Sequence, residues 1–218
     1  MNAFLHDLGR RAYAPTLALQ EEWVARASVD AAAPARLILV EHDPAVITLG
    51  RRARDGDVRA DAERLRELGI AVHASARGGA ATWHGPGQLV AYPIVRLSRE
   101  RPLRAHVHGL EEALLAALSR FGVRAHRIKG LTGVWVGEEK IAAIGVAVRR
   151  WIAWHGLALN VDPDLEAFRL IVPCGIEGKG VTSLARCLGR PVRLEEIKPI
   201  LAECLAVALG LAFVREPR

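Results

Sequence analysis

Cys174 is the residue best placed for nucleophilic chemistry among the three cysteines of this 218-residue chain. It stands between Pro173 and Gly175 at the end of an apolar run, which predicts a tight, accessible bend. A thiolate must be reachable if it is to attack a substrate. Cys204 lies within an amphipathic helical pattern and is predicted to be a core residue, and Cys187 is predicted to be packed or partly exposed. If the chain uses a cysteine as nucleophile, we expect it to be Cys174.

Lys140 begins an almost wholly apolar segment, residues 140–148. If its side chain points inward, desolvation and neighbouring groups would let it exchange protons near neutrality. The alternative is more common for a lysine at the end of a hairpin, and it leaves the ammonium group in water. His155 lies in a second apolar segment and could orient on Cys174 as in Cys-His peptidases, although most such histidines are satisfied core residues.

A polar, glycine-rich segment, RGGAATWHGPGQ, covers residues 77–88. Five glycine or proline residues in twelve exclude one regular element along its whole length. Glycine lets the backbone approach a ligand closely and leaves N–H groups free to face it. The segment could therefore cradle a carbonyl, a phosphate or an extended chain, with Arg77 and His84 supplying polarity. A plain turn between strands is the alternative, since the segment matches neither the dinucleotide-binding glycine motif nor the Walker phosphate loop.

The elements that must position these segments are helices and hairpin-connected strands. Apolar periodicity predicts helices over residues 15–28, 58–68, 107–121 and 194–209. Apolar runs predict strands over residues 36–41, 45–49, 70–74, 89–95, 123–128, 132–136, 140–148 and 151–161, with hairpin turns at 137–139 and 149–150. The run over 45–49 is expected to continue the first strand after the break at Asp43-Pro44, and 70–74 is expected to be a buried strand. The pattern favours an α+β fold with a mixed or antiparallel sheet flanked by helices, and one continuous domain over residues 1–218.

Composition limits the class of protein. Hydrophobic residues make up 51% of the chain and charged residues 25%, which is typical of a packed protein and not of a disordered one. The sequence has no signal-peptide pattern, no uncharged apolar run near the roughly 20 residues that span a bilayer, and too few cysteines for a disulfide framework. We therefore expect a cytoplasmic protein. The cysteines and the eight histidines lack the spacing of zinc ligands, so no metal site is expected.

The chain is basic, with 30 lysine and arginine residues against 24 aspartate and glutamate residues and a formal net charge of +6. Such a charge favours acidic partners. A nucleic-acid-binding module is disfavoured because the sequence has neither a recognition-helix pattern nor an aromatic and basic RNA-binding motif. An arginine-rich surface that simply faces water is the other interpretation.

Several segments together resemble the lipoyl(octanoyl) transferases, the octanoyl-carrier-protein:protein N-octanoyltransferases of the biotin and lipoate protein ligase superfamily. The similar segments follow the family's order along most of the chain: EHDPAVITLGRR (41–52), RGGAATWHGPGQLVAYPI (77–94), GVWV (133–136), KIAAIGVAVRRW (140–151), HGLALNV (155–161), and PCGI and VTSL within 173–184. The chain departs from the family at Trp83 and Trp154, where smaller or hydroxylated aromatic residues would be unsurprising. These departures could alter the acyl pocket, but they leave the chemistry intact.

The resemblance implies a biotin/lipoate protein ligase-like catalytic fold and two catalytic residues. Cys174, in the Pro-Cys-Gly segment, would carry the acyl group as a thioester, and Lys140 would favour the thiolate of that cysteine. The substrate-binding segments of the family correspond to Arg77, Gly78, Gly79, Ala80, Ala81, Thr82, Trp83, His84, Ala143, Ile144, Gly145, Gly156, Leu157 and Ala158.

The reaction that the resemblance implies needs no cofactor. Its donor, octanoyl-acyl carrier protein, is an activated thioester, so transfer to Cys174 is close to isoenergetic and transfer onward to a lysine amine is downhill. The acceptors would be the lipoyl domains of 2-oxoacid dehydrogenases and the glycine cleavage H protein. The carrier protein is strongly acidic and lipoyl domains commonly are, so the arginines would speed their encounter. An ATP-dependent lipoate or biotin protein ligase on the same fold is the main alternative.

Overall fold

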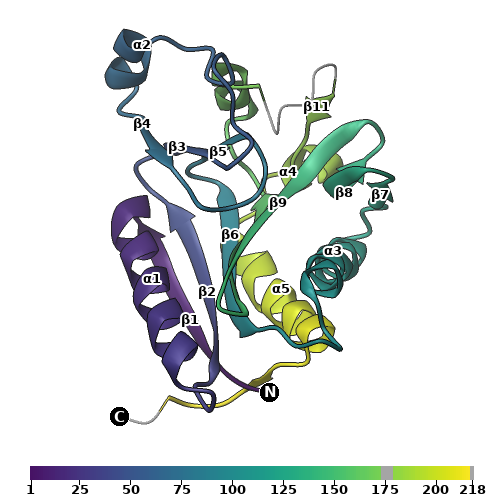
Figure 1. Ribbon diagram of the computed structural model, residues 1–218. Coiled ribbons are helices and arrows are strands. Elements are labelled where there is room, and N and C mark those ends of the chain that lie inside the picture. Colours follow the sequence, from purple (N-terminus) through teal and green to yellow (C-terminus); the bar gives the residue numbers. More distant parts are fainter. Residues whose placement is uncertain (173–178, 217–218) are drawn as a thin grey trace.

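A large mixed sheet forms the centre of the molecule (Figure 1). The computed structural model describes residues 1–172 and 179–216, so the predicted nucleophile Cys174 lies outside the described residues. In those ranges the sheet has nine strands, in the order β12-β1-β2-β6-β10-β9-β8-β7 with β11 joined to β9. They are β1 (Asn2–Arg11), β2 (Ala35–His42), β6 (Gln88–Arg96), β7 (His126–Ile128), β8 (Leu131–Val136), β9 (Glu139–Arg149), β10 (Ile152–Asn160), β11 (Gly180–Val181) and β12 (Ala212–Phe213).

Parallel and antiparallel pairs occur in the same sheet. Strand β1 runs parallel to β2 and β12, and β11 runs parallel to β9. From β2 through β6, β10, β9 and β8 every neighbouring pair is antiparallel. The two hairpins β8–β9 and β9–β10 lie where the sequence predicts them. The predicted α+β fold with a mixed sheet is therefore confirmed.

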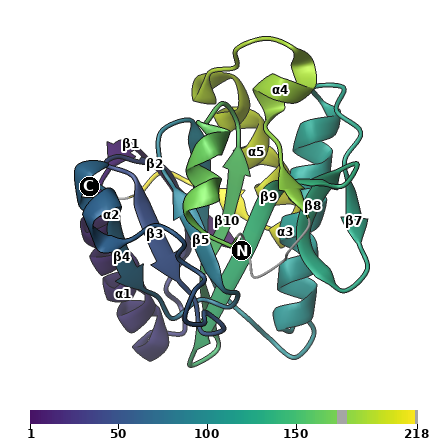
Figure 2. The same ribbon diagram turned by 90° about the horizontal axis from the view of Figure 1, so that it is seen from above.

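Helices cover both faces of the large sheet (Figures 1 and 2). Helix α1 (Tyr13–Val29) packs on one face, against β6 and β10, and α3 (Leu103–Ser119) and α5 (Leu194–Leu209) pack together on the other. Two shorter helices, α2 (Ala62–Glu67) and α4 (Leu184–Leu188), lie outside these layers. The predicted last helix agrees with α5 at both ends.

Strand β2 shows how the sequence builds a core on each face. Alternate side chains of a strand point to opposite sides of a sheet. Leu37 and Leu39 are buried in the core that includes α3 and α5, whereas Ile38 and Val40 are buried in the core that includes α1. Each fully buried aliphatic side chain contributes about 1.5–3 kcal/mol of transfer free energy. An almost continuous apolar run is thus what a strand between two helical layers requires.

A second, small sheet lies beside the ends of β2 and β6. It has the order β4-β3-β5 and consists of β3 (Val46–Leu49), β4 (Ala71–Ala74) and β5 (Ala81–His84). A 3₁₀ helix, η1 (Leu165–Leu170), packs against β5. This sheet has a core of its own, separate from the two cores of the large sheet.

Alternate side chains of strand β5 lie in that small core and in a cavity on the other side of the strand. Ala81 and Trp83 point into the small core, where the rings of Trp83 and Phe168 meet edge to face at 5.4 Å. Thr82 and His84, at the alternate positions, line the cavity instead. The glycine-rich segment therefore contains a short strand that sequence reasoning did not predict.

Four local predictions need correction. Residues 45–49 do not continue β2 but form β3 of the small sheet, after the break at Asp43-Pro44. Residues 70–74 form an edge strand with mostly exposed side chains and not a buried strand. The predicted helix over 58–68 begins only after Asp61, whose carboxylate accepts the N–H of Arg64 as an N-cap, because the preceding residues pair with the end of η1. The predicted strand over 123–128 is ordered as a strand only at His126–Ile128.

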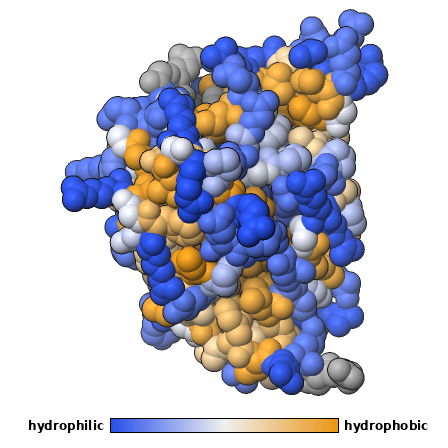
Figure 3. Space-filling view, turned by 180° about the vertical axis from the view of Figure 1, so that it is seen from behind, coloured by the Kyte–Doolittle hydropathy of each residue, from blue (hydrophilic) through white to orange (hydrophobic). Residues whose placement is uncertain are grey.

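The surface mixes hydrophilic and apolar side chains, and Figure 3 shows both kinds side by side on the face opposite the view of Figure 1. Cys204 is buried, as the sequence predicts, and Cys187 is exposed and not packed. Among the residues that the structure describes, no helix has both the length and the apolar composition needed to cross a bilayer.

Candidate active site

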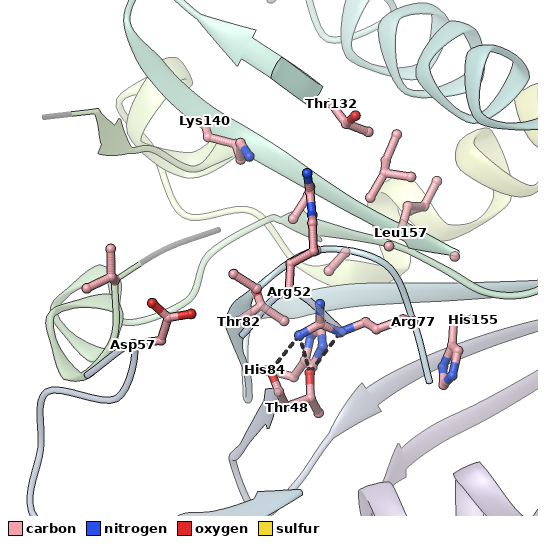
Figure 4. A pocket seen from close by; sticks show the side chains of 18 of the residues that line it. Thr48, Arg52, Asp57, Arg77, Thr82, His84, Thr132, Lys140, His155 and Leu157 are labelled. Atoms are coloured by element: carbon pink, nitrogen blue, oxygen red, sulfur yellow. Dashed lines mark hydrogen bonds between the residues drawn. The ribbon is translucent and has the colours of Figure 1, made fainter. Parts of the chain in front are cut away.

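A cavity of about 800 Å³ lies between the small sheet and strands β9 and β10 of the large sheet (Figure 4). This volume is typical of a site for a small molecule or for one end of a larger substrate. One part of its lining is apolar and comprises Val90, Leu131, Ala143, Ile144, Leu157 and Ala158. The other part carries arginine, lysine, histidine, tyrosine, threonine and aspartate side chains. The cavity can therefore hold an aliphatic chain with polar groups at its reacting end.

Lys140 points into this cavity from β9 and is only 7% exposed (Figure 4). The residue opposite it on β8 is Trp135, and the Lys140 Nζ lies 4.7 Å from the centre of the Trp135 ring. Within the described residues Lys140 has no ion pair with a carboxylate. A buried ammonium group is costly unless it has a partner, and contact with an aromatic face offsets part of that cost. The arrangement leaves N–H donors of Lys140 directed at the cavity.

The chain before residues 173–178 lines the cavity, and the chain after them pairs with Lys140. Val172, two residues before Cys174, lines the cavity, and its N–H donates to the carbonyl of Asp57 at 2.8 Å. Beyond that segment, Val181 of β11 pairs with Lys140 itself, and the N–H of Thr182 donates to the Lys140 carbonyl at 3.0 Å. Two segments far apart in the sequence thus converge on one cavity.

The Arg77 side chain supports the walls of the cavity from within. Its guanidinium Nε donates to the Thr48 Oγ1 at 3.1 Å, and its Nη1 donates to the carbonyl of Gly78 at 3.1 Å (Figure 4). The carbonyls of Arg77 and Gly79 accept N–H groups from Arg51 and Arg52 at 3.0 Å each. Arg77 is buried and joins the glycine-rich loop to β3 and to residues 50–52, which gives it a structural role as well as a place in the lining.

Two predicted site glycines are required by close backbone approach. A Cβ added at Gly156 would lie 2.2 Å from the carbonyl oxygen of Ala91 on the neighbouring strand β6. A Cβ added at Gly145 would lie 2.9 Å from the carbonyl oxygen of Gly78. Since real Cβ atoms do not approach oxygen so closely, only glycine lets these strands and the glycine-rich loop meet at this wall.

Three histidines and two tyrosines form a buried polar group at the base of the cavity. His42 Nε2 and the Tyr92 hydroxyl are 2.9 Å apart, and the Tyr13 and His84 rings each contact the His42 ring edge to face. His155 stacks on Trp154 with 4.1 Å between ring centres. Its φ of +57° is rare for a residue other than glycine, and its buried Nε2 has no partner in the described residues.

Burial keeps these imidazoles neutral. It lowers the pKa of His42 to about 4 and the pKa values of His84 and His155 to about 3. It also raises the pKa of the Tyr92 hydroxyl well above its usual value. The fixed positive charge in the cavity therefore comes from lysine and arginine side chains and not from histidine.

Lowering the pH is expected to destabilise the fold through these histidines. Their folded-state pKa values lie below the unfolded value of about 6.5, so the unfolded chain binds more protons and stability is lost as the pH falls below about 6.5. At pH 5 each would contribute a loss of about 2 kcal/mol at most. Urea unfolding at pH 7.5 and at pH 5 measures the difference in the free energy of unfolding. An unchanged value would contradict the expected destabilisation.

His106 provides a matched control for that experiment. It lies on α3, away from the cavity, its Nε2 is buried without a partner in the described residues, and burial lowers its pKa to about 4. His106→Leu should leave the wild-type fold intact and show a smaller loss of stability between pH 7.5 and pH 5. His108→Ala, at an exposed position of the same helix, should behave as the wild type.

Most of the residues that sequence reasoning assigned to substrate binding line this one cavity. They are Arg77, Gly79, Ala80, Thr82, His84, Ala143, Ile144, Gly145, Gly156, Leu157 and Ala158. Gly78 lies behind the wall, with its N–H donating to the carbonyl of Val146 at 2.9 Å. The side chains of Ala81 and Trp83 point into the small core, so Trp83 does not shape this cavity. Trp154 lies in the core that includes α1 and reaches the site only through its stack on His155.

Sequence reasoning missed an acidic and basic loop at the mouth of the cavity. Arg52, Arg54 and Asp57 line the cavity from residues 50–57, and Arg52 and Asp57 point into it (Figure 4). It also missed Tyr13 and Tyr92. The similarity of EHDPAVITLGRR (41–52) to the octanoyltransferases is the sequence signal that points to this loop. In the described ranges no three histidine, cysteine or acidic side chains are grouped as metal ligands would be.

Comparison with known proteins identifies the family. The model of the lipoyl protein ligase A/B catalytic domain matches residues 12–206. An octanoyltransferase from Chloroflexus aurantiacus is 46% identical, over 98% of this chain and 95% of its own length. An octanoyltransferase from Solibacter usitatus is 48% identical, over 90% of this chain and 88% of its own. The chain belongs to the octanoyltransferases of this family.

Solved structures of lipoate protein ligases share the fold of this chain. A lipoate-protein ligase A bound with ATP superposes with a TM-score of 0.79 at 19% identity, covering 99% of this chain and 89% of that one. A bi-partite lipoate protein ligase from Thermoplasma acidophilum gives a TM-score of 0.75 at 19% identity, covering 99% and 87%. At such identity the likeness concerns the fold alone. These structures confirm the predicted ligase-like catalytic fold. The curated relatives confirm the predicted acyltransferase activity of an octanoyltransferase.

Proposed function

We propose that this octanoyltransferase moves an octanoyl group from acyl carrier protein to a lysine of a lipoyl domain through a thioester on Cys174, with Lys140 as its catalytic partner. The observation that supports the proposal is the buried Lys140 ammonium, which lacks a carboxylate partner in the described residues and shares its cavity with Val172. A free thiol with a pKa near 8.5 is only a few per cent ionised at pH 7. A cation beside Cys174 would favour the thiolate.

Two acyl transfers complete the reaction. The Cys174 thiolate attacks the carbonyl carbon of the octanoyl thioester, and the pantetheine sulfur leaves and takes a proton from the Lys140 ammonium, which becomes a neutral amine. The acceptor lysine amine then attacks the carbonyl carbon of acyl-Cys174, the C–S bond breaks, and Lys140 receives the proton that the amine loses. The product is an octanoyl amide. No step consumes a nucleotide, because the donor thioester is already activated.

The cavity suits the two halves of this chemistry. Its apolar wall, which includes Ala143, Ile144 and Leu157, would hold the octanoyl chain, and the polar wall around Lys140 would hold the reacting carbonyl. Lipoyl domains as acceptors are supported by the archaeal ligase of similar fold, which is described together with its E2 lipoyl domain. The 2-oxoacid dehydrogenases and the glycine cleavage H protein remain the proposed sources of those domains. A cytoplasmic location and a single domain over residues 1–218 are part of the same proposal.

Mass spectrometry of the intact protein tests the proposed function. Incubation with octanoyl-acyl carrier protein and no ATP is expected to add one octanoyl group, which peptide mapping should locate on Cys174. Addition of a lipoyl domain should then remove the group and transfer it to the domain's lysine. Acylation that appears only with ATP would show instead that the chain is a ligase, and an octanoyl group on any other residue would exclude the Cys174 thioester.

The arginines at the mouth of the cavity are expected to speed the encounter with an acidic carrier protein. Arg51, Arg52 and Arg54 are exposed and have no ion pair within the described residues. Screening by salt weakens such attraction. We therefore expect kcat/KM for octanoyl-acyl carrier protein to fall at least about tenfold between 50 and 500 mM salt, whereas kcat/KM for octanoyl-pantetheine stays constant.

Variants that remove a positive charge test whether the arginines at the cavity cause the salt dependence. Arg52→Gln combined with Arg54→Gln should flatten the salt response of the carrier-protein reaction. Arg26→Gln removes an arginine that is paired with Glu22 on α1, and it should leave the response unchanged. A wild-type enzyme that is indifferent to salt would refute the electrostatic role of the basic surface.

A further inference from the structure

A continuous chain of buried hydrogen bonds connects the base of the cavity with Lys140. His84 Nδ1 lies 2.7 Å from the Gln88 Oε1, and the Gln88 Nε2 donates to the Asn160 Oδ1 at 2.9 Å. The Asn160 Nδ2 donates to the carbonyl of Thr182 at 3.0 Å, and the N–H of Thr182 donates to the carbonyl of Lys140 at 3.0 Å. All five residues are buried. Side chains from β5, β6 and β10 thus reach the strand that carries Lys140.

The Thr182 carbonyl determines which group donates and which accepts in each side-chain hydrogen bond between it and His84. The Thr182 carbonyl can only accept, so the group facing it must be the NH₂ of Asn160, and the Asn160 Oδ1 is then an acceptor. Gln88 must present its NH₂ to that oxygen, and the same NH₂ also donates to the carbonyl of Trp83 at 3.4 Å. The Gln88 Oε1 is left facing His84 Nδ1, which must therefore carry a proton.

A proton on Nδ1 determines what His84 offers to the cavity. The ring is neutral because burial lowers its pKa to about 3, so a proton on Nδ1 leaves Nε2 without one. Nε2 has no hydrogen bond to the described residues, and His84 lines the cavity. The cavity therefore contains a hydrogen-bond acceptor in a fixed orientation, in a lining that also includes the donors Arg52 and Lys140 and the carboxylate of Asp57.

We propose that Gln88 and Asn160 are positioning residues that hold His84 in its Nδ1–H tautomer, so that Nε2 accepts an N–H group of the substrate. The proposal rests on the octanoyl transfer proposed above. Two N–H groups enter such a site: the amine of the acceptor lysine, and the amide N–H of the donor's pantetheine arm. Either group could donate its N–H to His84 Nε2. Separate rates for acylation of Cys174 and for transfer from acyl-Cys174 show which of them does.

The tautomer can be measured directly on the whole protein. In long-range ¹H–¹⁵N NMR spectra, wild-type His84 is expected to show a protonated Nδ1 and an unprotonated Nε2 at pH 7. Gln88→Met removes the acceptor from Nδ1 and should yield a mixture of tautomers or the Nε2–H form. Gln88→Glu keeps an oxygen acceptor at that place and should preserve the Nδ1–H form. A wild-type His84 with its proton on Nε2 would overturn the proposal.

Rates of the half-reactions show whether the tautomer matters. Gln88→Met and Asn160→Leu should each lower one half-reaction about tenfold or more, and Gln88→Glu should recover part of the loss in Gln88→Met. A lower rate of Cys174 acylation points to the N–H of the donor arm, and a lower rate of transfer from pre-acylated enzyme points to the acceptor amine. Altered tautomers with both rates unchanged would overturn the proposal.

A control variant separates this inference from general instability, and acylation of the wild type separates it from the proposed function. His106→Leu, which lies on α3 outside the chain of hydrogen bonds, should keep the wild-type tautomer and the wild-type rates. Should Gln88→Met fail to fold, Gln88→Glu and the wild-type tautomer still decide the question. If the wild type does not form acyl-Cys174, the proposed function fails. If acyl-Cys174 forms but His84 carries its proton on Nε2, only the present inference fails.

Discussion

Replacing Cys174 by alanine is expected to reduce octanoyl transfer by at least about 10³-fold, because both proposed half-reactions pass through its sulfur. The purified variant should accept no octanoyl group from acyl carrier protein. The variant is expected to keep its fold. The measurement is the initial rate of lipoyl-domain octanoylation, together with the intact mass after exposure to donor.

The other two cysteines serve as matched controls for this loss. Cys187 is exposed, with its sulfur 3.9 Å from the Thr182 Oγ1, and Cys204 lies in the core beside α3. Cys187→Ala should keep the wild-type rate, and Cys204→Ala should lower stability but not transfer. Cys174→Ser is the informative conservative change, because a hydroxyl is far less ionised than a thiol. Full activity in Cys174→Ser would mean that no acyl-Cys174 intermediate is formed.

Much of the fold could be predicted because its signals are local. The apolar runs of β6, β9 and β10 each extend over nine or more residues, which indicates strands that are buried on both faces. The amphipathic pattern of α5 is longer still and indicates a helix with one buried stripe. Strand β1 escaped prediction because it lies near the sheet edge, and its side chains are mostly exposed or half-buried. The sequences of β2 and β3 are both short apolar runs, and the two strands differ in the partners with which they pair, which place them in different sheets.

The site could be predicted in part, for a related reason. Residue types and family resemblance nominated Lys140 and His84, but they could not establish that Lys140 is buried. That depends on Trp135, which lies opposite it only because of the β8–β9 register. The Gln88–Asn160 link joins residues 72 positions apart, so no local pattern could reveal it. The left-handed backbone of His155 has no local signal in the sequence either.

Replacing Lys140 by methionine is expected to lower kcat about 10²- to 10³-fold while KM for the lipoyl domain changes little. Methionine fills the space over the Trp135 ring but supplies neither the charge that favours a thiolate nor a group that accepts a proton. Both half-reactions should slow. Lys198→Met is the matched control, since Lys198 is half-buried and is paired with Asp7 outside the site, and it should keep the wild-type kcat.

Lys140→Arg separates the two functions of the amine. Arginine keeps a positive charge but does not release its proton in a protein. If Lys140 moves a proton, Lys140→Arg should still form acyl-Cys174 at an appreciable rate, but transfer from acyl-Cys174 to the lipoyl domain should fall about 10²-fold or more. Single-turnover measurements of each half-reaction across pH 6 to 9 test this. A Lys140→Arg enzyme with near-normal transfer would confine Lys140 to an electrostatic role, and the acceptor amine would then need another proton acceptor within the cavity.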